Sequence, residues 1–361
     1  MSSSHDGNCR KKPVFDRESI LVASALIALL VIAVLWGPGA AWSAPPPQYE
    51  IKLATLAPEN SSLMRVFNEM NAELLEKSGG RLGFKMYTGF ALGDEADVLR
   101  KLRIGLVHAA VFTNTALTDV NMDLRVLQVP FLFNNYEEVD YILEKLEGDL
   151  QKGFAGQGFE VLGWPELGFI YFMSKAPVAG IDDLRGKRVW AQADAPMAQA
   201  MIDKAGISTV AITAPDVLMA LQTNLLDVVY NSPYYALVTQ WHTQLKYITD
   251  LPLSYIGGTL LIDKKRFDRL PPELQKTMKT VCARHLKRLV EKTRQDNADA
   301  LGVMLKRGVQ EVKPNPDQVR EFRNISNAAV ADLGPKVMPR NTLAKVEAAL
   351  AEFRASHPEA Q

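Results

Sequence analysis

The side chains best suited to chemistry are aromatic and polar residues at the ends of predicted strands between residues 181 and 233. Trp190 ends a short strand after the turn IDDLRGKR, Tyr230 and Asn231 end a second strand, and Tyr234 follows. An aromatic surface with a few hydrogen-bonding groups is a usual lining of a small-molecule pocket. We therefore predict a ligand-binding site at these strand ends.

Sequence patterns for catalysis are missing. The histidines beyond residue 100 are scattered, with no pair at metal-ligand spacing. No serine lies in a nucleophile elbow, and no cysteine is paired with a histidine. Gly186 and Lys187 lack the glycine spacing of a phosphate loop, and Arg188 stands where Ser or Thr is required. We therefore expect that the protein is not an enzyme and binds no metal or cofactor. The alternative is an enzyme that uses the same pocket.

Strands alternate with helices along most of the chain. Strands are predicted at 51–55, 82–88 and 109–113, with helices at 63–77 and 95–104 between them. A strand at 187–191, a helix with Met197 and Met201, a strand at 210–212, a helix with Leu218, Leu221 and Leu225, and a strand at 228–230 follow. This alternation is typical of α/β folds, in which ligands bind at the carboxyl ends of the strands.

The apolar spacing after Pro271 predicts a helix of about 35 residues, which at ~1.5 Å per residue exceeds 50 Å. A helix of that length would lie across both lobes or bend between them. Two shorter helices are predicted near 317–333 and 342–353. We predict a first lobe from 45–167 plus 256–296, a second from 168–255 plus 297–361, and a cleft between them.

Composition and the N-terminus point to an exported protein. The 361 residues contain 41 basic and 41 acidic side chains, a balance that gives no overall field for nucleic acid. Basic residues precede an uncharged apolar run at 19–37, and small residues follow. Residues 1–44 are therefore a signal peptide or a membrane anchor, and both place the remainder in the periplasm. Cys282, alone after this segment, is expected to be a buried core residue.

Five motifs in order resemble the substrate-binding proteins of tripartite ATP-independent periplasmic (TRAP) transporters. They are GFALG at 89–93, VPFLF at 129–133, DLRGKRVW at 183–190, LQTNLLD at 221–227 and KKRFDRLPPE at 264–273. The resemblance covers about residues 50–310. It implies an α/β fold of the periplasmic-binding-protein type, with two lobes, a central cleft and a long helix spanning both. It also implies closure on a small ligand and delivery to a membrane permease without ATP hydrolysis.

Two departures from that family bear on the ligand. Typical members carry an arginine that grips the substrate carboxylate where Trp190 stands here, and a second arginine where Ile170 follows Gly168-Phe169. The resemblance then implies a cleft with an apolar wall, as in a subgroup that works with a TPR-repeat partner. Arg188 lies one strand alternation from Trp190, so an organic-acid receptor with a shifted arginine stays open, as does an anchored lipid-handling protein. The candidate ligand-binding residues are Trp190, Ile170, Asn231, Tyr230, Tyr234, Trp164, Thr113, Asn114 and Arg188.

Overall fold

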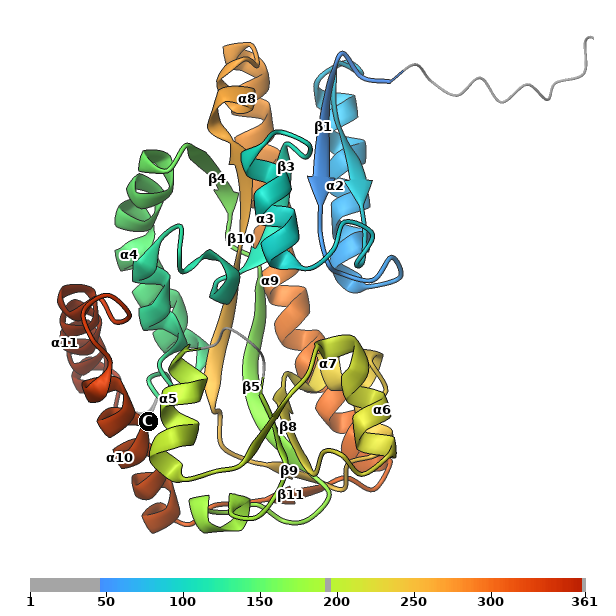
Figure 1. Ribbon diagram of the computed structural model, residues 1–361. Coiled ribbons are helices and arrows are strands. Elements are labelled where there is room, and N and C mark those ends of the chain that lie inside the picture. Colours follow the sequence, from blue (N-terminus) through green and yellow to red (C-terminus); the bar gives the residue numbers. More distant parts are fainter. Residues whose placement is uncertain (1–45, 192–195, 359–361) are drawn as a thin grey trace, which may run out of the picture. The chain divides into compact units, whose positions relative to one another are not determined.

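The computed structural model describes residues 46–191 and 196–358 (Figure 1). The chain divides into Met1–Pro46 and one compact unit, Pro47–Gln361, and only the second is described below. The predicted signal peptide or anchor, with its apolar run at 19–37, lies outside the described residues. Within the described residues, no helix combines the length and the hydropathy needed to cross a membrane.

The first lobe begins with parallel strands packed on helices. Its elements are β1 (Tyr49–Ala54), α2 (Ser62–Lys77), β2 (Leu82–Tyr87), α3 (Glu95–Arg103) and β3 (Ala109–Thr113), and β1 pairs in parallel with β2 and β3. α2 starts at Ser61, whose hydroxyl accepts a hydrogen bond from the amide of Met64 and so satisfies one of the free amides of the first turn. Phe67, Met70 and Leu74 form the buried face of α2, which confirms the periodicity expected there.

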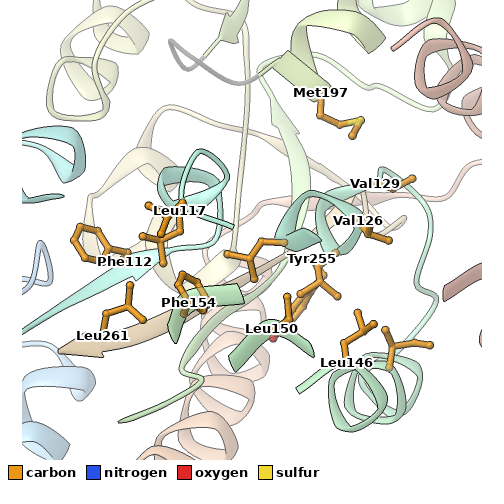
Figure 2. Packing of buried hydrophobic residues seen from close by; sticks show 14 of the residues in the cluster. Phe112, Leu117, Val126, Val129, Leu146, Leu150, Phe154, Met197, Tyr255 and Leu261 are labelled. Carbon is orange, nitrogen blue, oxygen red and sulfur yellow. The ribbon is translucent and has the colours of Figure 1, made fainter. Parts of the chain in front are cut away.

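A less regular segment joins this sheet to the rest of the lobe. It runs through two 3-10 helices, η1 (Thr115–Leu117) and η2 (Met122–Gln128), to α4 (Tyr136–Gly156) and β4 (Phe159–Gly163). Figure 2 shows Val126 and Val129 among the buried side chains of this region, together with Leu146, Leu150 and Phe154. The apolar side chains of the segment thus hold it on the core.

The second lobe repeats the alternation of strand and helix. It contains η3 (Ile181–Leu184), β6 (Val189–Ala191), α5 (Pro196–Ala205), β7 (Thr209–Ala211), η4 (Ala214–Asp216), α6 (Val217–Gln222), β8 (Val228–Asn231), α7 (Pro233–Val238), η5 (Trp241–Thr243) and β9 (Tyr247–Thr249). β6 pairs in parallel with β7 and β8. The placement of Leu225 on a buried helical face was wrong. α6 ends at Gln222, Asn224 adopts a φ of 57°, and Leu225 is 47% exposed.

Two long antiparallel strands run through both lobes and join their sheets. β10 (Ser254–Asp263) pairs with β3 and β4 at its C-terminal end and with β5 (Glu166–Ser174) at its N-terminal end, and β5 continues to β8. The hydrogen-bonded order is β2-β1-β3-β10-β5-β8-β6-β7, so the two sheets are connected (Figure 1). The register shifts within β10 at Ile256/Gly257 in the pairing with β5 and at Leu260/Leu261 in the pairing with β4, on either side of the point where one partner strand gives way to the other.

The long helix forms as expected. After α8 (Lys264–Asp268), α9 spans Pro272–Lys306, 35 residues, and packs on α2 in the first lobe and on α7 in the second (Figure 1). β11 (Gln310–Val312), α10 (Pro316–Asp332) and α11 (Arg340–Ser356) complete the chain. α10 packs on α5, but α11 packs on α4 of the first lobe, so the C-terminal region contacts both lobes. The predicted lobe boundaries remain predictions.

Candidate ligand-binding site

A cavity of about 110 Å³ lies between the η1–η2 segment and the second lobe. Strands β5, β6 and β8, helix α5 and the start of β10 form most of its wall. The apolar lining includes Ile170, Phe172, Val189, Met197, Met201 and Ile207. A wholly apolar cavity of ~150 Å³ is known to hold benzene, so the apolar part of this smaller cavity fits a compact group no larger than that.

Strand geometry explains which side chains reach the cavity. Successive side chains of a strand point to opposite faces, so Ile170 and Phe172 share one face of β5. Val189 of β6 lies on the cavity side, and the next residue, Trp190, lies on the other. Tyr230 of β8 contributes to the lining and also packs against the indole of Trp190, with ring centroids 5.1 Å apart.

Trp190 is therefore placed behind the cavity wall. Its side chain is 2% exposed and packs edge to face on Trp241, with ring centroids 5.4 Å apart. Its indole N–H donates to the backbone carbonyl of Ile212 at 3.0 Å, which satisfies the one donor of the ring. A direct contact between Trp190 and ligand remains a prediction, whereas Ile170 and Tyr230 lie in the lining.

Polar groups enter the cavity mainly from η2. Arg125 and Gln128 both line it, together with Thr115 and the start of β10 at Ser254. The Arg125 guanidinium donates through Nη1 to the carbonyl of Val337 at 2.9 Å and through Nη2 to the hydroxyl of Thr118 at 3.3 Å. The Gln128 amide oxygen accepts from the hydroxyl of Thr115 at 3.4 Å. These contacts fix the two side chains at the edge of the cavity.

Tyr234 connects the lobes. Its hydroxyl accepts from the backbone amide of Ser62 at 3.3 Å and lies 3.4 Å from the Ser62 hydroxyl. Ser62 belongs to the first turn of α2 and Tyr234 to the first turn of α7, so this pair joins a helix of each lobe. The contact is a candidate for holding the lobes together, although Tyr234 does not line the 110 Å³ cavity.

Thr113 and Asn114 have partners of their own at the end of β3. The amide and hydroxyl of Thr113 both donate to the carboxylate of Glu95, at 2.5 and 2.8 Å. Burial raises the pKa of Glu95, against the lowering effect of these two donors. Asn114 is 1% exposed, and its side-chain oxygen accepts from the hydroxyl of Thr259 at 3.3 Å. The structure places both residues in the packing of the first lobe.

Three other candidates lie apart from the cavity lining. Arg188 forms a two-point ion pair with Asp227, with both N–O distances 2.7 Å, and its side chain is 47% exposed. Trp164 donates to the Glu147 carboxylate at 3.2 Å and packs on Phe154. The side-chain oxygen of Asn231 accepts from the next backbone amide in the chain. Nothing in these contacts assigns a ligand to them.

The sequence analysis did not identify Arg125 and Gln128. Four of the six residues at 124–129 are apolar, so the segment reads as a buried run in which these two polar residues do not stand out. The available signal is the spacing of three between the two polar residues. In a 3-10 helix, side chains at i and i+3 share one face, so an R-x-x-Q pair projects together.

The chain belongs to the bacterial extracellular solute-binding proteins of family 7, whose profile matches residues 53–335. These proteins are the periplasmic solute receptors of TRAP transporters, and they are receptors rather than enzymes. The family therefore confirms the resemblance and the two-lobe α/β fold. A small-molecule ligand and a membrane permease as partner are typical of the family.

Three similar proteins illustrate the relationship. The C4-dicarboxylate-binding periplasmic protein of Rhodobacter capsulatus is 22% identical over 78% of this chain and 85% of its own. A solved TRAP periplasmic solute-binding protein from Ochrobactrum anthropi is 23% identical, with a TM-score of 0.78 over 86% of this chain and 97% of that chain. A Bordetella pertussis extracytoplasmic receptor that binds pyroglutamic acid is 19% identical, with a TM-score of 0.74 over 82% and 99%.

Proposed function

We propose that this TRAP receptor binds a ligand that is less anionic and more hydrophobic than a C4-dicarboxylate, in the cavity between η2 and the second lobe. The observation that carries the proposal is the lining. Ile170, Phe172, Val189, Met201 and Ile207 present hydrocarbon, methyl and ring surfaces to the cavity. The ligand is delivered to the membrane permease subunits of the transporter, and no nucleotide is consumed by the receptor.

The energetics of burial favour this class of ligand. An ionised carboxylate that leaves water without a cation or several donors costs several kcal/mol. A C4-dicarboxylate carries two such groups, and the second would face the apolar wall of β5 and α5. By contrast, each ~25 Å² of apolar ligand surface that is buried contributes about 0.6 kcal/mol. An apolar body with few polar atoms therefore gains affinity where a small dianion loses it.

An organic-acid receptor that uses Arg188 is the alternative. Relatives such as the R. capsulatus protein are described as binding C4-dicarboxylates, so the possibility comes with the family. Against it stands the ion pair of Arg188 with Asp227, since the guanidinium already has a carboxylate at 2.7 Å on two of its nitrogens. A ligand carboxylate would first have to displace Asp227. At this half-exposed position the new ion pair between ligand and Arg188 would itself contribute at most ~1 kcal/mol to binding.

Trp190 has a part in the proposal through Tyr230. The indole supports the Tyr230 ring that lines the cavity, and we expect Trp190→Ala to weaken binding of an apolar ligand by about 1–3 kcal/mol. Because Trp190 is buried, the same change also destabilises the fold, by about 3–5 kcal/mol. Trp190→Phe keeps most of the ring and separates the two effects.

Location and partners follow from the family. Family membership and the pattern of basic and apolar residues in 1–44 support export to the periplasm. Sequencing the N-terminus of the mature protein would show whether residues 1–44 are cleaved or retained. A reporter fused after residue 60 should be active only outside the cytoplasm. The comparisons give no support for a TPR-repeat partner. The genes next to this one would show two permease subunits if the proposal holds.

Calorimetric titration with succinate and malate tests the proposal. We expect no micromolar binding of either acid by the wild-type protein. Micromolar binding that is lost on Arg188→Gln but retained in Trp190→Phe would refute the apolar-ligand proposal and establish the organic-acid alternative.

A further inference from the structure

We propose that one end of the first lobe is a docking surface for an anionic phospholipid membrane, which holds the receptor close to the permease that it supplies. This surface, called the lobe apex below, consists of the turn at 103–108 between α3 and β3 and of residues 264–269, which comprise α8 and Arg269. Figure 1 shows α8 and the start of β3 at the same end of the lobe. The inference goes beyond the proposed function, because it concerns a surface and not the identity of the ligand.

Hydrogen bonds join the two parts of the lobe apex. The amide of Asp263, the residue before α8, donates to the carbonyl of His108 at 2.9 Å, and a guanidinium nitrogen of Arg266 lies 2.6 Å from the imidazole Nε2 of His108. Leu106 precedes His108 by two residues and Ile104 precedes it by four. Because an extended chain spans at most about 3.6 Å per residue, the turn and α8 form one continuous surface.

Two aliphatic side chains protrude from the turn. α3 ends in a Schellman motif, in which Gly105 adopts a φ of 75° and the amide of Leu106 donates to the carbonyl of Lys101 at 2.9 Å. An apolar residue at the position of Leu106 usually packs back on the last turn of the helix, but that turn presents Arg100 and Lys101 here. Leu106 is 56% exposed and Ile104 is 73% exposed, so both side chains project into solvent.

The acidic side chains next to α8 are already engaged. The carboxylate of Asp268 pairs with the ammonium group of Lys264 at 2.8 Å. The carboxylate of Asp263 caps α8, because it accepts a hydrogen bond from the amide of Arg266 at 2.8 Å. These two acidic groups therefore have partners of their own and do not neutralise the remaining basic side chains of the lobe apex.

Three exposed basic side chains of the lobe apex have no counter-ion. They are Arg103, Lys265 and Arg269, and no ion pair joins any of them to an acidic residue within the part of the chain that the structure describes. The whole chain has equal numbers of basic and acidic residues, 41 of each. The lobe apex therefore carries a local excess of positive charge on a protein without a net charge.

Basic side chains around protruding aliphatic ones match the chemistry of an anionic bilayer. Lysine and arginine are attracted to lipid phosphates, and aliphatic side chains enter the boundary between the headgroups and the acyl chains. A surface that combined only exposed Ile104 and Leu106 would not select a charged partner, and basic residues alone would not require apolar ones. The combination of both at one end of the lobe therefore favours a membrane surface.

The place where the chain enters the lobe supports the same partner. β1 begins at Tyr49, and it runs parallel to β3, so both strands start at the end of the lobe that carries the apex. The amide of Tyr49 donates to the carbonyl of Arg81, in the turn before β2, at 2.8 Å. The candidate membrane anchor at 19–37 is thus joined to the receptor at this end.

The test places an environment-sensitive dye on the lobe apex. Ile104→Cys is made together with Cys9→Ser and labelled with a nitrobenzoxadiazole dye, since Cys282 is buried. We expect the emission to increase and shift to the blue with vesicles of equal parts phosphatidylglycerol and phosphatidylcholine, but not with phosphatidylcholine alone. Met219→Cys is the matched control, because Met219 is a 69% exposed apolar residue of α6 in the second lobe, and its dye should not respond.

The dye reports its own surroundings, so the experiment uses the full chain as the cell makes and processes it, with residues 1–44 cleaved or retained. Removal of two charges then tests the electrostatic part. Lys265→Gln combined with Arg269→Gln should weaken the response to anionic vesicles on the order of 10- to 30-fold, since each basic residue near an anionic surface contributes roughly fivefold. Raising the salt concentration should weaken it as well.

A second pair of substitutions controls for the loss of charge itself. Lys246→Gln combined with Lys306→Gln removes the same two charges from the far end of α9, where both lysines are exposed and the carbonyl of Lys246 accepts from the amide of Gln310 at 2.8 Å. This double variant should respond to anionic vesicles as the parent protein does. All four substituted side chains project from the surface or its edge, so the fold should be retained, and circular dichroism checks this.

The outcomes decide whether the lobe apex binds lipid. A response at position 104 that requires phosphatidylglycerol and depends on Lys265 and Arg269 supports the proposal. The absence of a response at position 104, an equal response to both kinds of vesicle, or an equal response at positions 104 and 219 overturns it. A response that appears only when the permease subunits are present also overturns it, because the partner is then a protein.

Discussion

Arg294 joins the long helix to the strand that connects the lobes, and its removal should destabilise the protein strongly. The guanidinium donates from Nε and Nη2 to both carboxylate oxygens of Glu166 at 3.0 Å, and from Nη1 and Nη2 to Asp140 at 2.7 and 2.6 Å. It also stacks 4.3 Å from the ring centre of Tyr136. Glu166 begins β5, so this group sits where the strand leaves the first lobe.

The burial of Glu166 determines how much unfolding free energy is lost when Arg294 is replaced. The Glu166 side chain is 1% exposed, and its other contact is the hydroxyl of Tyr255 at 3.0 Å. Arg294→Met would leave that carboxylate in the interior without a counter-ion, which costs about 3–5 kcal/mol of the free energy of unfolding. Glu166→Gln should cost less, about 1–2 kcal/mol, because Arg294 is 22% exposed and keeps Asp140.

Urea unfolding of the two variants tests whether Arg294→Met loses more stability than Glu166→Gln. Arg288→Met is the matched control, since Arg288 lies on the same helix in an exposed ion pair with Glu69 and should lose less than ~1 kcal/mol. Equal losses for Arg294→Met and Glu166→Gln, or a loss for Arg294→Met no larger than that of the control, would refute the reasoning.

The pH dependence of Arg294→Met gives a second check. Burial raises the pKa of Glu166, and Arg294 opposes that shift, so the variant should raise this pKa further. At pH values above the ordinary Glu pKa, the folded state of the variant then binds more protons than its unfolded state. Its free energy of unfolding therefore rises as the pH falls. The stability gap between variant and wild type should therefore narrow between pH 7.5 and pH 5.

Three more predictions follow from single contacts. Burial and the nearby Arg266 lower the pKa of His108, so the unfolded state binds more protons than the folded state near the ordinary histidine pKa. The free energy of unfolding should therefore fall as the pH drops from 7 through about 6.5. Urea titrations of His108→Gln should show no such loss. Burial raises the pKa of Cys282 to about 12, and its thiol should react with a disulfide reagent in urea but not in native buffer; native labelling would contradict its burial. Tyr234→Phe should remove about 1 kcal/mol and increase the radius of gyration in X-ray scattering; an unchanged radius and stability would show that the contact with Ser62 does not hold the lobes.

The long helix and the first parallel strands could be predicted from sequence because one face of each carries a clear period. α9 alternates buried residues such as Leu274, Met278 and Val281 with charged ones, and the pattern fixed its length to within a residue or two. β5 and β10 were not identified. Most residues of β10 are buried on both faces, and a strand in the middle of a sheet gives an apolar run without alternation.

The candidate site was only partly predictable for a similar reason. A predicted strand end indicated Tyr230, and the resemblance to TRAP receptors indicated Ile170; both residues line the cavity. Sequence alternation could not tell which face of β6 meets the cavity, and Val189 lies there instead of Trp190. Arg125 and Gln128 come from a 3-10 helix, which is too short to produce a recognisable hydrophobic period.

The identity of the molecule carried by the native receptor tests the central claim most directly. The protein is purified gently from the producing cells, and the ligand released on denaturation is identified by mass spectrometry against protein stripped by dialysis. The account predicts a compact molecule with an apolar body and no more than one carboxylate. Recovery of succinate, malate or a sugar acid in stoichiometric amount would contradict it.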